Sequence, residues 1–293
     1  MEEKKIWKGT TYGNGWMHGA LIFMLKYINV RIIYSFVAIF VVPVCMIVNP
    51  GRRVIYKYFR ERWSCSPLKS FLKTYQNFYL FGQVVVDKFA MYAGKKFEVT
   101  IDGYDEFTKL ASRERGFVQL SAHIGNYEIA GYTLKAETKR FNALVYSGEK
   151  DSIMENRNRM FEHSNITMIG IKSDMSHMFA INNALYNGEI VSMPADRLFG
   201  SSKCVSHPFL RATAKFPYGP FAVATSRSAD VLAVNVLKVS TRRYHIYVTP
   251  LNYDKEASRK DQIEQLSHAY VQELERLLKK YPEQWYNYYD FWS

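Results

Sequence analysis

The chain has 293 residues, 48% of them hydrophobic, which is enough for one large domain or two with a sizeable core. Its net charge of +12, from 39 Lys and Arg against 27 Asp and Glu, calls for an acidic partner such as nucleic acid, an anionic membrane or an acidic substrate. Zinc-finger, KH and RNP signatures are absent and the basic residues alternate with apolar and aromatic ones, so we expect a membrane surface and no nucleic acid.

The cysteines and the first residues narrow the setting further. Cys45, Cys65 and Cys204 are far apart and form no Cys-x-x-Cys pair, which indicates a reducing compartment and no structural metal. Residues 1–8 are not followed directly by an apolar core and a small-residue cleavage site, so we expect no signal peptide.

Residues 32–48 form a stretch without a single charge. As a helix it would span about 25 Å, somewhat short of a hydrocarbon core of about 30 Å. Pro43 lies inside it and favours a kink or a break. Basic residues flank both ends, so the positive-inside rule gives no clean orientation for a single crossing.

We therefore expect residues 1–95 to form an N-terminal helical membrane-associating region, with a monotopic or re-entrant anchor whose two ends face the cytoplasm. A transmembrane span extended back to Ala20 and a buried core helix are the alternatives. Residues 70–92 have apolar side chains at helical spacing before Gly94, which predicts a further helix.

Residues 96–293 alternate between apolar runs and helical patterns, which predicts an α/β domain with a central mixed sheet flanked by helices. The strands are expected at residues 98–102, 117–122, 142–146, 166–171, 189–193, 231–239 and 244–249. The helices are expected at residues 127–137, 152–163, 175–186, 220–228 and 260–280.

The most informative stretch is residues 116–128. His123 comes at the end of a short apolar strand, Gly125 and Asn126 supply turn chemistry and a candidate helix N-cap, and Glu128 falls in the first helical turn. Ligands bind at the carboxyl ends of strands in α/β sheets, where a neutral imidazole can accept a hydroxyl proton and a carboxylate can hold its tautomer. The alternative is a structural strand-end histidine and a glutamate that favours the helix dipole.

Asp196 and Arg197 follow another apolar strand, so we expect them at the same sheet edge as His123. Asp196 could orient a substrate or support a backbone oxyanion hole, or it could form only an Asx turn. Arg197 could pair with a phosphate or thioester, or it could be a solvated surface charge.

Four blocks resemble a known family. His123-Ile-Gly-Asn-Tyr-Glu128 resembles the His-x4-Glu box of the bacterial lipid A biosynthesis late acyltransferases, within the glycerolipid acyltransferase superfamily. Gly188-Glu-Ile-Val-Ser-Met-Pro-Ala-Asp196 resembles the second block of that family. Phe209 with Phe216-Pro-Tyr-Gly-Pro-Phe-Ala-Val-Ala224 resembles the third, and Pro282-Glu-Gln-Trp285 resembles its C-terminal signature.

The resemblance implies an acyltransferase domain over residues 96–293 that moves a fatty-acyl chain from acyl carrier protein or acyl-CoA to a hydroxyl of a lipid A precursor-like acceptor, at the cytoplasmic face of the inner membrane. It implies no cofactor and no metal. His123 and Glu128 would be catalytic, and Gly125, Asn126, Asp196 and Arg197 would bind substrate or support the oxyanion.

One departure from the family concerns the acceptor. Many members have Tyr-Arg-Pro after the next strand, whereas this chain has Tyr146-Ser147-Gly148. Either Arg157 or Arg159 replaces the missing cation, or the acceptor lacks the usual phosphate or sugar, as a lysophospholipid or a polyene-type lipid would. A lipid hydrolase and a non-catalytic membrane scaffold are the rival functions; the absence of a Gly-x-Ser-x-Gly elbow argues against the hydrolase.

Overall fold

The computed structural model describes residues 15–134, 136, 138–146, 165–171, 176–198 and 203–292, which belong to two compact units. The first, called the helical unit, takes in Met1–Lys96, Tyr146–Ser164 and Tyr286–Asp290. The second, called the sheet unit, takes in Phe97–Val145, Asn165–Trp285 and Phe291–Ser293.

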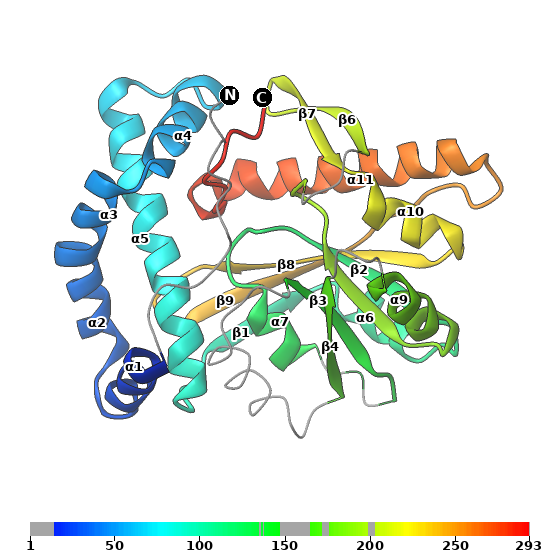
Figure 1. Cartoon of the computed structure of the whole chain (residues 1–293), viewed down its shortest axis with the longest axis horizontal. Helices are drawn as coiled ribbons and strands as arrows, with labels where there is room; N and C mark the ends of the chain where they lie inside the picture. The colour runs from blue at the N-terminus through cyan, green and yellow to red at the C-terminus, as the bar shows by residue number, and fades with distance from the viewer. Residues whose placement is uncertain are drawn as a thin grey trace. The chain divides into compact units, whose positions relative to one another are not determined.

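The helical unit is built around one long helix, α5, which the apolar spacing predicts. Ser66 accepts a hydrogen bond from the backbone N–H of Lys69 and Pro67 takes the first helical position, so α5 begins with a side-chain cap. The helices of this unit run from blue to cyan in Figure 1: α1 (Gly15–Tyr27), α2 (Val30–Phe36), η1 (Val37–Val41), α3 (Val42–Val48), α4 (Gly51–Lys57), η2 (Tyr58–Arg62) and α5 (Pro67–Tyr92).

Of the kink or break expected at Pro43, the break does not occur, because Val30–Val48 is one continuous helix. Its middle is a π-helical turn, in which the N–H of Val42 bonds the carbonyl of Val37, five residues earlier. The next residue in that register is Pro43, which has no N–H, so the carbonyl of Ala38 lacks its helical donor. Tyr75 of α5 supplies one instead: its Oη donates to the Ala38 carbonyl at 2.5 Å.

We expect Tyr75→Phe to lower the free energy of unfolding by about 1 kcal/mol, because it removes the donor that replaces the missing N–H of Pro43. Thermal unfolding in detergent, followed by circular dichroism, measures the change. Tyr27→Phe is the matched control, since Tyr27 is largely exposed. Equal stability of the two variants would contradict this account of the helix.

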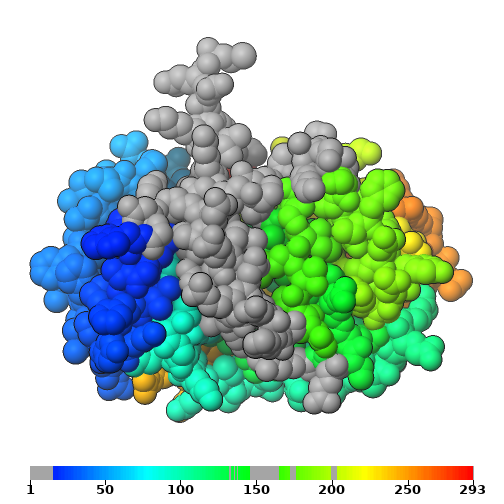
Figure 2. Space-filling model, turned by 60° about the horizontal axis from the view of Figure 1, so that its bottom comes forward, coloured from blue at the N-terminus to red at the C-terminus, as the bar shows by residue number. Residues whose placement is uncertain are grey.

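The Val30–Val48 helix leaves most of its apolar side chains at least partly exposed. It has 19 residues and a mean hydropathy of 2.4, and only 22% of its most apolar window is buried. This exposure argues against the buried core helix that we considered. Further exposed apolar side chains lie on α1, dark blue in Figure 2, and on α5. We call the following set the exposed apolar surface: Trp16, Phe23, Tyr27, Ile32, Phe36, Ile39, Phe40, Val44, Ile47, Val48, Leu68, Phe71 and Leu72.

The sheet unit contains a seven-stranded sheet in the order β1-β9-β8-β2-β5-β3-β4. β8 and β9 pair antiparallel, whereas β1 with β9, β8 with β2, β2 with β5, and β5 with β3 pair in parallel, so the predicted mixed α/β sheet is confirmed. The strands are β1 (Glu98–Asp102), β2 (Phe117–Ser121), β3 (Phe141–Tyr146), β4 (Ile166–Ile171), β5 (Ile190–Pro194), β8 (Asp230–Lys238) and β9 (Arg243–Pro250).

Helices flank this sheet, with α10 and α11 on one side in Figure 1 and α6 and α7 on the other. They are α6 (Tyr104–Ala111), α7 (Glu128–Thr133), α9 (His177–Tyr186), α10 (Tyr218–Ser226), α11 (Arg259–Lys280) and η3 (Pro282–Gln284). The sequence predicts α9, α10 and α11 within a few residues. It predicts α7 too long, and the helix expected at residues 152–163 lies outside the described residues.

The hairpin of β6 (Cys204–Phe209) and β7 (Ala212–Pro217) escapes the sequence prediction. Its two turn residues, Leu210 and Arg211, both have positive φ, a conformation that sequence rules associate with Asn and Gly. The turn is stabilised from outside, because the N–H of Leu210 donates to the Glu275 carboxylate of α11 at 3.0 Å. A contact with a distant helix therefore replaces the usual turn residues.

Candidate active site

Two parallel strands bring a histidine and an aspartate together. β2 and β5 pair in register, with Ser121 opposite Pro194, so the two strands end side by side. His123 follows the end of β2 by two residues and Asp196 follows the end of β5 by two residues. The expectation that both occupy one sheet edge is confirmed.

The contacts between these two residues are close. The Nδ1 atom of His123 lies 2.7 Å from Oδ1 of Asp196, and the backbone N–H of His123 donates to Oδ2 at 3.0 Å. A third donor is the indole Nε1–H of Trp285, 3.3 Å from Oδ2. Asp196 is fully buried, whereas 28% of the His123 side chain is exposed. The imidazole is thus reachable from outside while the carboxylate behind it is not.

The electrostatics favour a neutral imidazole beside an ionised acid. Burial and the charge of Arg197 lower the pKa of His123, against the opposing effect of Asp196. Burial alone would raise the pKa of Asp196, but the charge and ring hydrogen bond of His123, the charge of Arg197 and the His123 backbone N–H together lower it to about 2. An ionised carboxylate only accepts, so Nδ1 carries the proton and Nε2 presents a lone pair.

The Nδ1 partner of His123 is Asp196, the role that we expected for Glu128. Glu128 is the first residue of α7 and is largely buried. The sequence favoured Glu128 as the partner of His123 because only five residues separate them. Asp196 is 73 residues away from His123 and meets it only through the pairing of β2 with β5.

Gly125 and Asn126 do not offer backbone donors to a substrate, contrary to the expected oxyanion support. The N–H of Gly125 donates to the carbonyl of Gln284 at 2.9 Å, and the N–H of Asn126 donates to the carbonyl of Val236 at 2.8 Å. The N-cap of α7 is Tyr127, and the buried Asn126 side chain instead donates to Tyr244 Oη at 3.5 Å. Both residues therefore hold the His123 loop against β8 and the C-terminal segment.

Gly125 is required by geometry. Its φ is +56°, and a Cβ added there would lie 1.8 Å from the carbonyl oxygen of Val236. We expect Gly125→Ala to lower the free energy of unfolding by more than about 2 kcal/mol. Urea unfolding measures this loss against Gly219→Ala, where a Cβ meets nothing within 4 Å. Equal stabilities would contradict the structural role.

The predicted cations divide into two groups. Arg197 follows Asp196 directly and acts electrostatically on His123, so it belongs to the site. The other two, Arg157 and Arg159, were expected as possible replacements for the cation missing at Ser147, and they lie outside the described residues.

Comparison with known proteins identifies the family of this chain. The sequence profile of the family described as bacterial lipid A biosynthesis acyltransferase matches residues 74–292. The chain belongs to this family. It is an acyltransferase, as the four motif blocks imply. The crystal structure of the 1-acyl-sn-glycerophosphate acyltransferase from Thermotoga maritima is a structural neighbour, with 15% sequence identity, a TM-score of 0.40, and coverage of 92% of this chain and 100% of that chain. Comparison with curated proteins gives no match.

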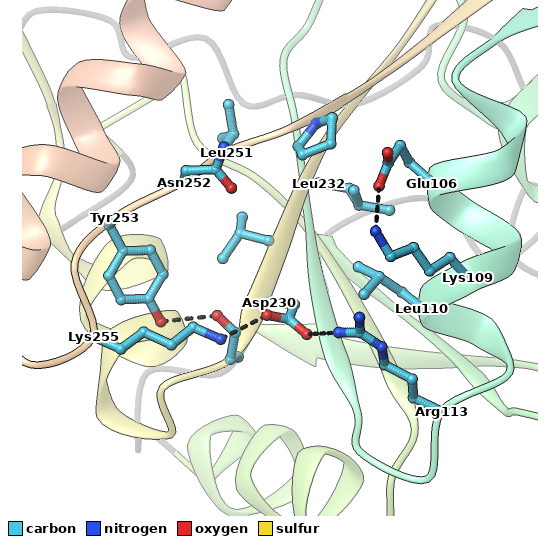
Figure 3. A pocket seen from close by; sticks show the side chains of 13 residues that line it. Glu106, Lys109, Leu110, Arg113, Asp230, Leu232, Leu251, Asn252, Tyr253 and Lys255 are labelled. Carbon is cyan, nitrogen blue, oxygen red and sulfur yellow. Dashed lines mark hydrogen bonds and ion pairs between the residues drawn. The ribbon is translucent and has the colours of Figure 1, made fainter.

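A pocket of about 220 Å³ lies at the opposite edge of the acyltransferase sheet. It surrounds Asp230, the first residue of β8, which pairs with Phe117 at the start of β2, whereas His123 follows the end of β2. In Figure 3 the Asp230 carboxylate joins Lys255 at 2.6 Å and Arg113 at 2.9 Å. These ion pairs make the pocket a charged structural cluster, ill suited to an acyl chain.

A serine and a histidine also meet elsewhere in the acyltransferase, on α11 and the hairpin. His207 Nε2 lies 2.7 Å from Ser267 Oγ, but Ser267 is fully buried and its hydroxyl donates to the carbonyl of Glu264. A hydroxyl in this position is neither accessible nor activated. It therefore offers no support for the hydrolase alternative.

Proposed function

We propose that this acyltransferase transfers a fatty-acyl chain from acyl carrier protein or acyl-CoA to a hydroxyl of a membrane lipid resembling a lipid A precursor, at the cytoplasmic face of the inner membrane. The observation that carries the catalytic part is the His123–Asp196 pair, in which Nδ1 donates to a buried carboxylate and Nε2 is left as a base.

The proposed reaction needs no enzyme nucleophile. Nε2 of His123 removes the proton of the acceptor hydroxyl while its oxygen attacks the thioester carbonyl, and the bond from that carbon to sulfur then breaks. The imidazolium returns its proton to the departing thiolate, so an ester and a free thiol result. Asp196 stabilises the imidazolium, and the guanidinium of Arg197 stabilises the developing oxyanion.

The pH dependence follows from the state of His123. Transfer needs the neutral imidazole, so kcat/KM should fall as the pH drops through the His123 pKa. Because burial and Arg197 lower that pKa below 6.5, we expect more than half of the maximal kcat/KM to remain at pH 6.5. An acid limb centred above pH 6.5 would contradict the proposed state of this residue.

Membrane association is proposed from the helical unit. The exposed apolar surface suits the acyl region of a bilayer, and the flanking residues Arg31, Arg52, Arg53, Lys57 and Arg60 suit anionic headgroups. Flotation with phosphatidylglycerol vesicles tests this: Phe36→Asp with Ile39→Asp should weaken binding, and Tyr104→Asp, a change of an exposed aromatic residue in the sheet unit, should not. Protease added outside right-side-out vesicles distinguishes the two topologies. Protection of an N-terminal tag supports the re-entrant anchor, and its cleavage supports a single span.

The acceptor is identified by lipid mass spectrometry of a deletion strain complemented with the wild type or with His123→Ala. We expect an acylated lipid that is present with the wild type and missing with His123→Ala. Its formation should consume the acyl thioester donor. A lysophospholipid or polyene-type product would identify another acceptor, the alternative that the departure at Ser147 and Gly148 leaves open. Free fatty acid alone would favour a hydrolase, and an unchanged lipid profile would favour a scaffold.

A further inference from the structure

The C-terminal Pro-Glu-Gln-Trp block ends beside the proposed catalytic pair. Pro282–Gln284 forms a 3-10 turn one residue after the end of α11. The next residue, Trp285, forms a bridge with Ile124, and the carbonyl of Gln284 accepts the N–H of Gly125. The block therefore pairs with the loop that carries His123.

Gln284 attaches this segment to β8 through its side chain. Its Oε1 accepts the backbone N–H of Lys238 at 2.9 Å, and its Nε2 donates to the Lys238 carbonyl at 2.7 Å. Gln284 is buried and so is Trp285. Each of these hydrogen bonds restricts the position of the tryptophan ring that follows.

The indole ring is packed on several sides by aromatic residues. Its centroid lies 5.6 Å from Phe209, 4.9 Å from Phe291 and 5.8 Å from Trp292, in edge arrangements. This packing directs Nε1 to Oδ2 of Asp196, on the carboxylate whose other oxygen meets His123 Nδ1. A carboxylate held by donors on both oxygens cannot rotate without losing a hydrogen bond.

We propose that Trp285 is a positioning residue of this acyltransferase: its indole N–H fixes the Asp196 carboxylate in the orientation that holds the His123 tautomer. The inference rests on the proposed function and adds a role for the C-terminal block. The Trp285 side chain is buried, away from solvent. It acts through Asp196, so its loss should affect turnover more than substrate binding.

The test compares two tryptophans of one cluster in the full-length protein. Trp285→Phe removes the donor to Asp196, and Trp292→Phe removes a similar indole whose N–H donates to the carbonyl of Phe209 at 3.4 Å. With the acyl thioester donor and lipid acceptor, Trp285→Phe should lower kcat about tenfold and change KM less than about threefold. Trp292→Phe should stay within about twofold of the wild type.

The pH profile and a double-mutant cycle separate positioning from packing. The charged groups that act on His123 are Asp196, which raises its pKa, and Arg197, which lowers it. Removing the indole donor leaves more negative charge on Asp196, so the pKa of His123 should rise. The acid limb of kcat/KM should therefore move to higher pH in Trp285→Phe but not in Trp292→Phe. In an Asp196→Asn background, Trp285→Phe should cost less than about twofold. Equal effects of the two tryptophan changes, or full additivity with Asp196→Asn, would overturn the proposal.

A spectroscopic measurement covers the case in which Trp285→Phe fails to fold or the wild type transfers no acyl group. In protein labelled with 15N-tryptophan, the indole N–H resonance that disappears in Trp292→Phe belongs to Trp292. Asp196→Asn should shift a different indole N–H resonance, that of Trp285. If no such resonance moves, the hydrogen bond is absent and the proposal is wrong. An inactive wild type with this shift would refute only the proposed function.

Discussion

Replacing His123 with alanine should lower the rate of acyl transfer by about a hundred- to ten-thousand-fold, the range for loss of a general base. The change removes the nitrogen that would take the hydroxyl proton. The change also removes the ring donor to the buried Asp196 carboxylate, so we expect it to lower the free energy of unfolding by about 1–3 kcal/mol. Transfer of a radiolabelled acyl chain from thioester to lipid measures the effect.

The matched control for this variant is His245→Ala. His245 lies on β9 in the same unit and contacts Thr100 and Asp102, at 2.8 Å and 3.0 Å. It should retain nearly the full rate. Circular dichroism and vesicle flotation verify that His123→Ala still folds and binds lipid. A folded His123→Ala protein that keeps most of its transfer rate would refute the assignment of the base.

The second large effect compares the two carboxylates near His123. Asp196→Asn keeps the size of the side chain but removes its charge, so it no longer selects the Nδ1–H tautomer or stabilises the imidazolium. We expect kcat to fall by up to about ten-thousandfold, by analogy with the loss of an orienting aspartate in hydrolytic triads. Glu128→Gln should have a clearly smaller effect, because Asp196 already occupies Nδ1.

Steady-state kinetics of the two variants decide between the acids, with urea unfolding to check that both remain folded. The burial of Asp196 makes this check necessary, since an amide there must find a new arrangement of donors and acceptors. If Glu128→Gln loses more activity than Asp196→Asn, the original expectation for the His-x4-Glu box is right and the Asp196 contact is structural.

The two carboxylates have different origins in the chain. Glu128 is near His123 because one turn separates a strand from a helix, and any α/β protein with this box would bring them close. Asp196 is near His123 because β2 and β5 end at the same level. A motif search finds the first acid easily, but only strand pairing identifies the second.

Local patterns in the sequence were sufficient for much of the fold. Short stretches rich in β-branched residues mark β1 and β4 without error, and apolar helical spacing marks α5 and α11 within a few residues. The sequence also determined that His123 and Asp196 follow strand ends. These features depend on residues close together in the chain, where side-chain period and turn chemistry act directly.

Tertiary structure decided the rest, in each case through a partner far away in the chain. Helix Val30–Val48 passes Pro43 because Tyr75 supplies a hydrogen bond from α5. The backbone N–H groups of Gly125 and Asn126 do not support an oxyanion, because they donate to the carbonyls of Gln284 and Val236. His123 obtained Asp196 and Trp285 as neighbours only when β2, β5 and the C-terminal segment came together. The physical reason is common to all three: hydrogen-bonding groups leaving water must find partners, and the fold alone determines which partners are within reach.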